Sequence, residues 1–139
     1  MTVLLLCKDS FYVILSIESA VSTKGEFFFM WNNIENMILY EDKEIIVCHK
    51  AAGIAVQSAR IGIPDMESTL KNYLASKNPG TMPYLGIVHR LDQPVEGVLV
   101  FAKNKRAAAG LTGQITSGSV TKEYLAVTDQ KPENVQGHL

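Results

Sequence analysis

The sequence predicts a single domain that combines β-strands with α-helices, and three observations support this prediction. The chain has 139 residues, the length of one domain and enough to bury a hydrophobic core. Short apolar runs at 85–88 and 98–102 are typical of buried strands. Apolar residues at helical spacing between 66 and 74 indicate an amphipathic helix. The composition, 47% hydrophobic and 19% charged, is ordinary for a globular protein.

Residues 1–36 differ from the remainder of the chain. Their apolar runs, 1–6 and 11–17, are separated by Lys8-Asp9-Ser10. No basic residue precedes Lys8, as a signal peptide would require, and neither run reaches the roughly 20 residues of a membrane span. We therefore expect 1–36 to be a poorly ordered extension or the product of an upstream start codon, with no membrane association, and 37–139 to be the domain.

The first strand of the domain is predicted at 44–49, because its apolar run is continuous. Lys50-Ala51-Ala52-Gly53 forms a turn, and 54–56 begins a second strand or extended segment. Asp65 is suited to cap a helix whose apolar face holds Met66, Leu70, Tyr73 and Leu74. Asn78-Pro79-Gly80 ends this helix.

A second helix is predicted from 105 to about 115, with Asn104 as its N-cap. Its buried residues should be Ala108, Leu111 and Ile115, and Gly118 should end it. Alternation at 121–127 indicates a last strand, whereas 130–139 has no clear pattern.

The most informative stretch lies between the apolar runs 85–88 and 98–102. It holds His89, Arg90 and Asp92 in a polar turn that Pro94 and Gly97 punctuate. Loops between rigid strands often position reactive groups. Taken alone, however, an aspartate there would more simply accept backbone hydrogen bonds in the turn.

The motif His89-Arg90-Leu91-Asp92, with Gly97 and the strand ending in Phe101-Ala102-Lys103, resembles the signature of the RluA-type pseudouridine synthases. These enzymes isomerise uridine in RNA to pseudouridine. The resemblance runs from about residue 37 to about 127 and includes Leu39-Tyr40-Glu41-Asp42, Lys50-Ala51-Ala52-Gly53 and Lys122-Glu123-Tyr124-Leu125-Ala126-Val127. One departure is Val95-Glu96, where the family usually has Thr-Ser.

The resemblance implies an α+β fold with a mixed, largely antiparallel central sheet and flanking helices. Residues 37–139 would form the N-terminal part of the catalytic domain. The family has a later block whose arginine pairs with the catalytic aspartate, and no arginine follows Tyr124 here. We therefore expect the domain to be incomplete, feeble or inactive alone, and in need of a missing C-terminal half.

The resemblance also implies roles for individual residues. Asp92 corresponds to the catalytic carboxylate, acting as a nucleophile or as a base. Tyr124 corresponds to a tyrosine that stacks on the target base and assists proton transfer at C5, although a strand tyrosine often only packs. Arg90 would clamp the backbone once the base is extruded, or form a structural ion pair. His89 is expected to pack or to bond the loop.

A net charge of −1 argues against RNA binding by bulk positive charge. Basic residues nevertheless outnumber acidic ones between 86 and 127, and Lys103 and Lys122 are candidate phosphate contacts, with a solvated helix start at 103–106 as the alternative. The expected partner is RNA, ribosomal or transfer. We expect no cofactor and no metal, since Cys7 and Cys48 lack paired spacing, and a cytoplasmic location.

Other interpretations of the motif are an RNA-binding remnant without catalysis and an interaction protein with a coincidental match. A kinase-like loop is excluded, because Leu91 separates Arg90 from Asp92 and no glycine-rich phosphate loop is present. The sequence therefore favours an RNA pseudouridine synthase.

Overall fold

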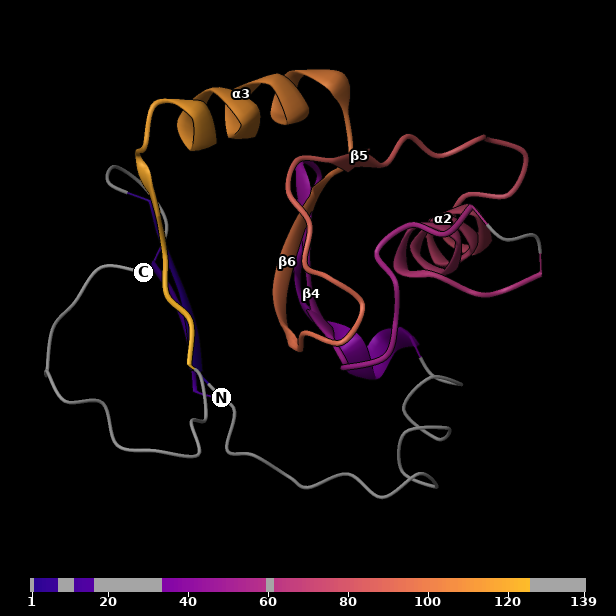
Figure 1. Cartoon of the computed structure of the whole chain (residues 1–139). Helices are drawn as coiled ribbons and strands as arrows, with labels where there is room; N and C mark the ends of the chain where they lie inside the picture. Colours follow the sequence, from indigo (N-terminus) through magenta and orange to yellow (C-terminus); the bar gives the residue numbers. More distant parts are fainter. Residues whose placement is uncertain (1, 8–11, 17–33, 60–61, 126–139) are drawn as a thin grey trace, which may run out of the picture.

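The computed structural model describes residues 2–7, 12–16, 34–59 and 62–125, and of the first two ranges it describes the backbone. Two sheets are present in these ranges, with strand orders β3-β4-β6-β5 and β2-β1-β7. Figure 1 shows α2 on one side of the four-stranded sheet and β7 with β1 and β2 on the other. The elements in chain order are β1 (Thr2–Cys7), β2 (Tyr12–Ser16), η1 (Ile34–Met37), β3 (Ile38–Glu41), β4 (Ile45–Lys50), α2 (Met66–Lys77), β5 (Gly86–Ile87), β6 (Gly97–Ala102), α3 (Lys105–Thr116) and β7 (Val120–Lys122).

The expectation of an α+β fold with a largely antiparallel sheet is confirmed, and every strand pair in the described ranges is antiparallel. The centre is the β4–β6 ladder, which runs from Ile45 opposite Ala102 to Lys50 opposite Gly97. All of β6 is buried. Its continuous apolar sequence fits a strand that is covered on both faces.

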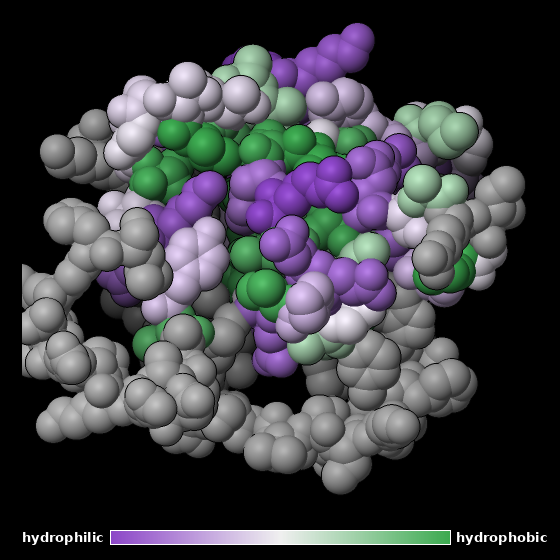
Figure 2. All heavy atoms as spheres, viewed as in Figure 1, coloured by the Kyte–Doolittle hydropathy of each residue, from purple (hydrophilic) through white to green (hydrophobic). Residues whose placement is uncertain are grey.

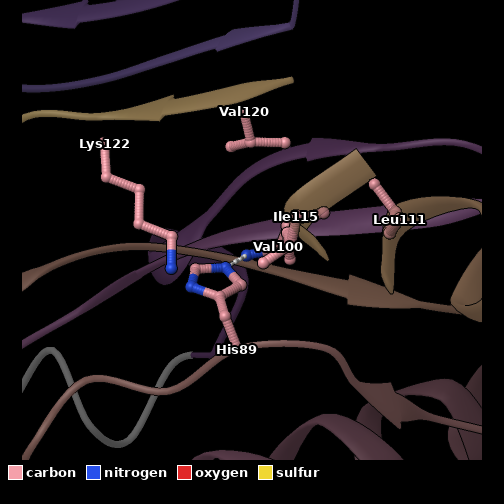
Figure 3. A pocket seen from close by; sticks show the side chains of 6 residues that line it. All are labelled: His89, Val100, Leu111, Ile115, Val120 and Lys122. Atoms are coloured by element: carbon pink, nitrogen blue, oxygen red, sulfur yellow. Dashed lines mark hydrogen bonds between the residues drawn. The ribbon is translucent and has the colours of Figure 1, made fainter. Parts of the chain in front are cut away.

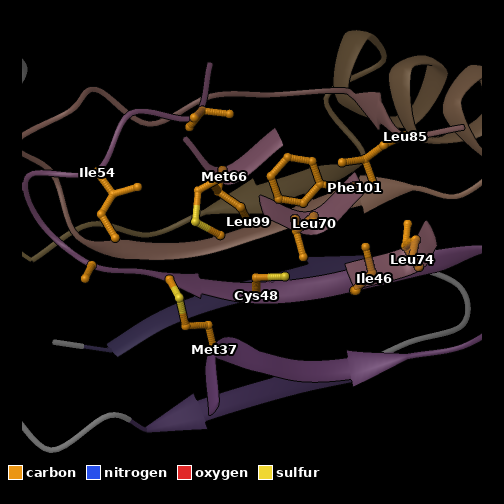
Figure 4. Close-up of a cluster of buried hydrophobic side chains, with 12 residues drawn as sticks. Met37, Ile46, Cys48, Ile54, Met66, Leu70, Leu74, Leu85, Leu99 and Phe101 are labelled. Carbon is orange, nitrogen blue, oxygen red and sulfur yellow. The ribbon is translucent and has the colours of Figure 1, made fainter. Parts of the chain in front are cut away.

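The two faces of this ladder carry separate hydrophobic clusters, because successive strand residues point to opposite sides. Leu99 and Phe101 join the larger cluster beneath α2, which Figure 4 shows together with Ile46 and Cys48. Val98 and Val100 join the smaller cluster with Val47. Leu111 of α3 packs against this smaller cluster, and Figure 2 shows apolar side chains beneath that helix.

The helix α2 begins and ends where the sequence predicts. Asp65 accepts a hydrogen bond from the Ser68 amide at 2.7 Å, and the Ser68 hydroxyl lies 3.2 Å from the Asp65 amide, which completes a capping box. Met66, Leu70 and Leu74 are buried against the sheet, as expected. The predicted C-terminal boundary at Asn78 is also confirmed.

The second predicted helix is confirmed in position and only partly in packing. Asn104 caps α3 by accepting from the Ala107 amide at 2.9 Å. Ala108, Leu111 and Ile115 are half-buried, so the prediction that they are buried was too strong. The helix still approaches β5 closely, since a Cβ on Gly86 would lie 3.1 Å from the Cβ of Ala108.

Three strand predictions need correction. The segment 54–56 is not a strand, because its carbonyls are used locally: those of Ala55 and Val56 accept from the start of α2. The strand β5 is shorter than the predicted 85–88. The strand β7 covers 120–122, whereas the prediction was 121–127, of which 126–127 lie outside the described residues.

The boundary predicted between residues 36 and 37 falls inside η1, and most of 1–36 lies outside the described residues. Within the described part of the chain, no helix is long and apolar enough to cross a membrane.

The end of β6 that leads to α3 is fixed by an ionic cluster around Glu41. Its carboxylate accepts hydrogen bonds from Lys103 at 2.7 Å, from Tyr73 at 2.8 Å and from Lys77 at 2.9 Å. Burial alone would raise the pKa of Glu41, but these hydrogen bonds outweigh burial and lower it to about 2. The cluster thus ties β3, α2 and the start of α3 together.

Glu41→Gln is expected to lower the free energy of unfolding by about 1–3 kcal/mol at pH 7, since it removes the charge that three donors share. The folded pKa lies below the ordinary 4.5, so this contribution is present above pH 4.5 and disappears as the pH falls towards 2. Urea unfolding at several pH values measures it. Glu123→Gln, on an exposed residue, is the matched control, and equal stability of the two variants would contradict the prediction.

Candidate functional site

The segment from β5 to β6 carries the predicted site residues at two levels of burial. It has no helix or strand between Ile87 and Asp92, whose carbonyl accepts from the Val95 amide at 3.0 Å and so closes a turn. Arg90 and Asp92 are exposed, whereas His89 and Leu91 are half-buried. Asp92 therefore stands at the surface beside a turn with a defined backbone.

A buried lysine holds this turn in place. Lys50 has no exposed surface, and its ammonium donates to the carbonyls of Ile54 at 2.8 Å, Gln93 at 3.1 Å and Ala51 at 3.2 Å. All three donors of the ammonium are therefore used. Burial lowers the pKa of Lys50, and the nearby carboxylates Glu96 and Asp92 oppose that shift.

Gln93, the neighbour of Asp92, is also bound to the turn after β4. The Gly53 amide donates to the Gln93 carbonyl at 2.8 Å, and the Gln93 side-chain amide donates to the Gly53 carbonyl at 2.9 Å. Gly53 has a φ of 88°, a value that glycine adopts at little cost. Sequence reasoning identified 50–53 as a turn but missed the role of Lys50. A lysine at the end of a buried strand was the available signal.

His89 fixes the other side of the same segment. Its Nε2 accepts a hydrogen bond from the Val100 amide of β6 at 3.1 Å. The imidazole thus takes the place of the backbone carbonyl that a longer β5 would have supplied. Burial, with a smaller effect from the Lys122 charge, lowers the pKa of His89 to about 4, so the ring is neutral near pH 7. Figure 3 shows the Lys122 side chain pointing toward the imidazole. The expected loop-bonding role of His89 is confirmed.

Lys122 and Tyr124 meet the loop at a small depression. Both line it, together with His89, Leu91 and Glu96. The side chain of Tyr124 is 63% exposed, so its ring remains available. The structure thus brings Lys122 and Tyr124 to Leu91, while Arg90 and Asp92, which flank Leu91 in the chain, are exposed and do not line this depression.

Lys103 lies apart from these residues, at the opposite end of β6. Its ammonium binds Glu41 at 2.7 Å and donates to the Asp42 carbonyl. The charge of Lys103 is therefore compensated within the protein.

Glu96 and His49 form a pair that the sequence gave no reason to expect. Glu96 Oε1 lies 3.0 Å from His49 Nε2 across the β4–β6 ladder. Glu96 is the residue at which the central motif departs from the family pattern.

No group of three His, Cys, Asp or Glu side chains within 34–59 and 62–125 is arranged to hold a metal ion. Burial, with a small contribution from Glu41, raises the pKa of the Cys48 thiol to about 12, so it is a packed, unreactive side chain.

Comparison with known proteins identifies this arrangement. The model of the RNA pseudouridylate synthase family matches residues 44–139. The ribosomal large subunit pseudouridine synthase D of Xylella fastidiosa is 41% identical over 92 residues, which cover 65% of this chain and 27% of that protein. The enzyme of the same name from Pseudomonas aeruginosa is 36% identical over 115 residues, 81% of this chain and 34% of that protein.

An RNA pseudouridine synthase of Zymomonas mobilis described as uncharacterized is 36% identical over 100 residues, or 72% of this chain and 44% of that protein. Among solved structures, human RNA pseudouridylate synthase domain containing 4 shares the fold, with a TM-score of 0.53 and 21% identity over 68% of this chain and 35% of that one. The chain thus spans less than half the length of the relatives it matches.

Lys50→Met is expected to destabilise the protein by about 2–4 kcal/mol, because three carbonyls lose their shared donor in a buried place. Hydrogen exchange should accelerate most at Gly53 and Val95, the amides that hold the turn. Lys71→Met is the control, since the Lys71 ammonium pairs with Glu67 of the same helix at 2.7 Å, away from this turn. Unchanged exchange at Gly53 would contradict a stapling role for Lys50.

The His89 ring should titrate with a midpoint near pH 4 in NMR spectra of the folded protein. Because its pKa is below the ordinary 6.5, the unfolded state binds the proton first. Stability from His89 is therefore complete above pH 6.5 and falls by roughly 1–3 kcal/mol as the pH drops to 4. A midpoint above 6 would show that His89 Nε2 is not held as an acceptor.

Proposed function

The chain belongs to the RNA pseudouridylate synthase family, and we propose that it isomerises uridine to pseudouridine in structured RNA. The observation that carries the proposal is the family match over 44–139. This range contains the turn that Lys50 holds in place, with Asp92 at the surface. Relatives named for the large ribosomal subunit make ribosomal RNA the preferred substrate, with transfer RNA as the other candidate.

The reaction requires a single carboxylate and no redox partner. The bond from N1 of uracil to C1′ breaks, the base rotates, and a bond from C5 to C1′ forms, while C5 gives up a proton and N1 gains one. Asp92 would start this sequence by attacking C1′ or by removing a proton from the sugar. Its exposed position allows a nucleotide that has left the stack to reach it.

The neighbours of Asp92 supply the binding functions. Arg90 is exposed two residues before Asp92 and would bind phosphate or stack on a base through its planar guanidinium. Tyr124 would stack on the target base and assist proton transfer at C5, and the stacking is worth about 1–3 kcal/mol. Lys122 lines the same depression as Tyr124, and its ammonium would supply a positive charge beside the bound RNA. Lys103 is left outside this set, because its charge is bound to Glu41.

A second candidate is RNA binding without catalysis. This candidate uses the exposed side chains of Arg90, Tyr124 and Lys122 to bind RNA and needs no chemistry at Asp92. We propose that polypeptide equivalent to the remainder of the relatives completes the site. We also propose that the protein works in the cytoplasm, with ribosomal or transfer RNA.

Tritium release from C5-labelled uridine in transcribed large-subunit ribosomal RNA tests both candidates, alongside RNA affinity. Asp92→Asn is expected to abolish release, by at least about a hundredfold, and to leave affinity within about threefold, because it keeps the shape and removes the nucleophile. Glu67→Gln is the control, because Glu67 lies on α2 and pairs with Lys71 of the same helix. Binding without release by the wild type supports the second candidate, and no binding at all contradicts both.

A further inference from the structure

Glu96 is held in position by a half-buried partner, His49. Its Oε1 is 3.0 Å from His49 Nε2, and the side chains are 41% and 12% exposed, respectively. His49 lies on β4 and Glu96 directly precedes β6, so the pair is anchored by the central ladder. Within the described part of the chain, the second carboxylate oxygen has no hydrogen-bond partner.

The free oxygen belongs to a side chain that lines the depression next to Tyr124. Segments far apart in the chain form its walls: Glu96 comes from the start of β6, and Tyr124 follows β7. The depression has a volume of about 20 Å³, room for roughly one water molecule. A nucleobase cannot enter it and would instead lie across its mouth, stacked on the exposed ring of Tyr124.

The charges around the depression disfavour a phosphate and favour the polar edge of a base. Glu96 and Glu123 contribute carboxylates, Lys122 contributes one ammonium, and His89 is neutral near pH 7. A phosphate would be repelled by the acidic pair. The edge of a base that carries a hydrogen-bond donor next to an acceptor could donate to the Glu96 carboxylate and accept from the Lys122 ammonium at the same time. Uracil has this pattern, since its N3–H lies between two carbonyl oxygens.

We propose that Glu96 is a specificity-determining residue that accepts the N3–H of the uracil stacked on Tyr124, while Lys122 donates to an adjacent carbonyl. His49 acts through Glu96 and is a positioning residue. The inference deepens the proposed function and rests on it. Cytosine would present an unprotonated N3 to the same carboxylate, so the contact selects uracil.

Binding of a short oligouridylate and of its N3-methylated counterpart tests the contact in the full chain by fluorescence anisotropy. Methylation should weaken binding to the wild type about tenfold, because a charge-assisted hydrogen bond is lost. Glu96→Gln keeps the size of the side chain and a neutral acceptor, so the effect of methylation should fall to about threefold. In Glu96→Ala it should fall below twofold.

Controls separate this contact from general charge effects and from misfolding. Glu123→Gln removes the same charge from the same depression and should retain the tenfold effect of methylation. His49→Phe should reduce that effect, since Glu96 loses its positioning donor, and urea unfolding checks that each variant is folded.

The outcomes distinguish the failure of this inference from that of the proposed function. If Tyr124→Ala weakens oligouridylate binding but N3-methylation has no effect on the wild type, Glu96 does not read the base. An equal effect of N3-methylation on binding to the wild type and to Glu96→Gln would indicate a steric clash and would overturn the inference. The inference would also be overturned if binding were weakened by replacing uridine with 2′-deoxyuridine but not by N3-methylation. No RNA binding by any variant would overturn both proposals.

Discussion

The buried ammonium of Lys50 decides where the loop that carries Asp92 can lie. A charge without exposed surface is costly unless every donor is used, and this one finds three carbonyls, on Ala51, Ile54 and Gln93. Two of these carbonyls belong to the turn after β4 and one to the turn before β6. The two turns therefore share one donor group, and neither can move without leaving it unsatisfied.

The two ends of the β4–β6 ladder have different roles, one structural and one at the candidate site. At one end, Glu41 gathers Tyr73, Lys77 and Lys103, and the result is a clamp between elements of the scaffold. At the other end, Lys50 satisfies carbonyls and leaves the Asp92 side chain at the surface. The apolar strand between them, buried along its whole length, keeps the distance between the two ends constant.

Local signals predicted the helices well, and long-range contacts explain what could not be predicted. Asp65 and Asn104 bond to amides three residues ahead, so the sequence alone indicates both helix starts. The segment 54–56 was ambiguous, because its carbonyls are used by Lys50 and by α2 rather than by a neighbouring strand. The compensation of Lys103 by Glu41 depends on residues 62 positions apart, which no local pattern contains. For the site, the resemblance nominated Asp92, Arg90 and Tyr124, and it could not nominate the Glu96–His49 pair, since Glu96 lies where this chain departs from the family pattern.

The segment that ends at Asp92 offers different side chains to the two parts of a nucleotide. His89 and Leu91 line the depression that Tyr124 borders, whereas Arg90 and Asp92 are exposed and do not line it. In the proposed complex, a uridine beside Leu91 would stack its base on Tyr124, where two carboxylates and one ammonium disfavour a phosphate. Its sugar and phosphate would then lie toward the carboxylate and the guanidinium. The base and the sugar are the two parts that the reaction separates and rejoins, so a backbone that sorts side chains in this way positions groups for both.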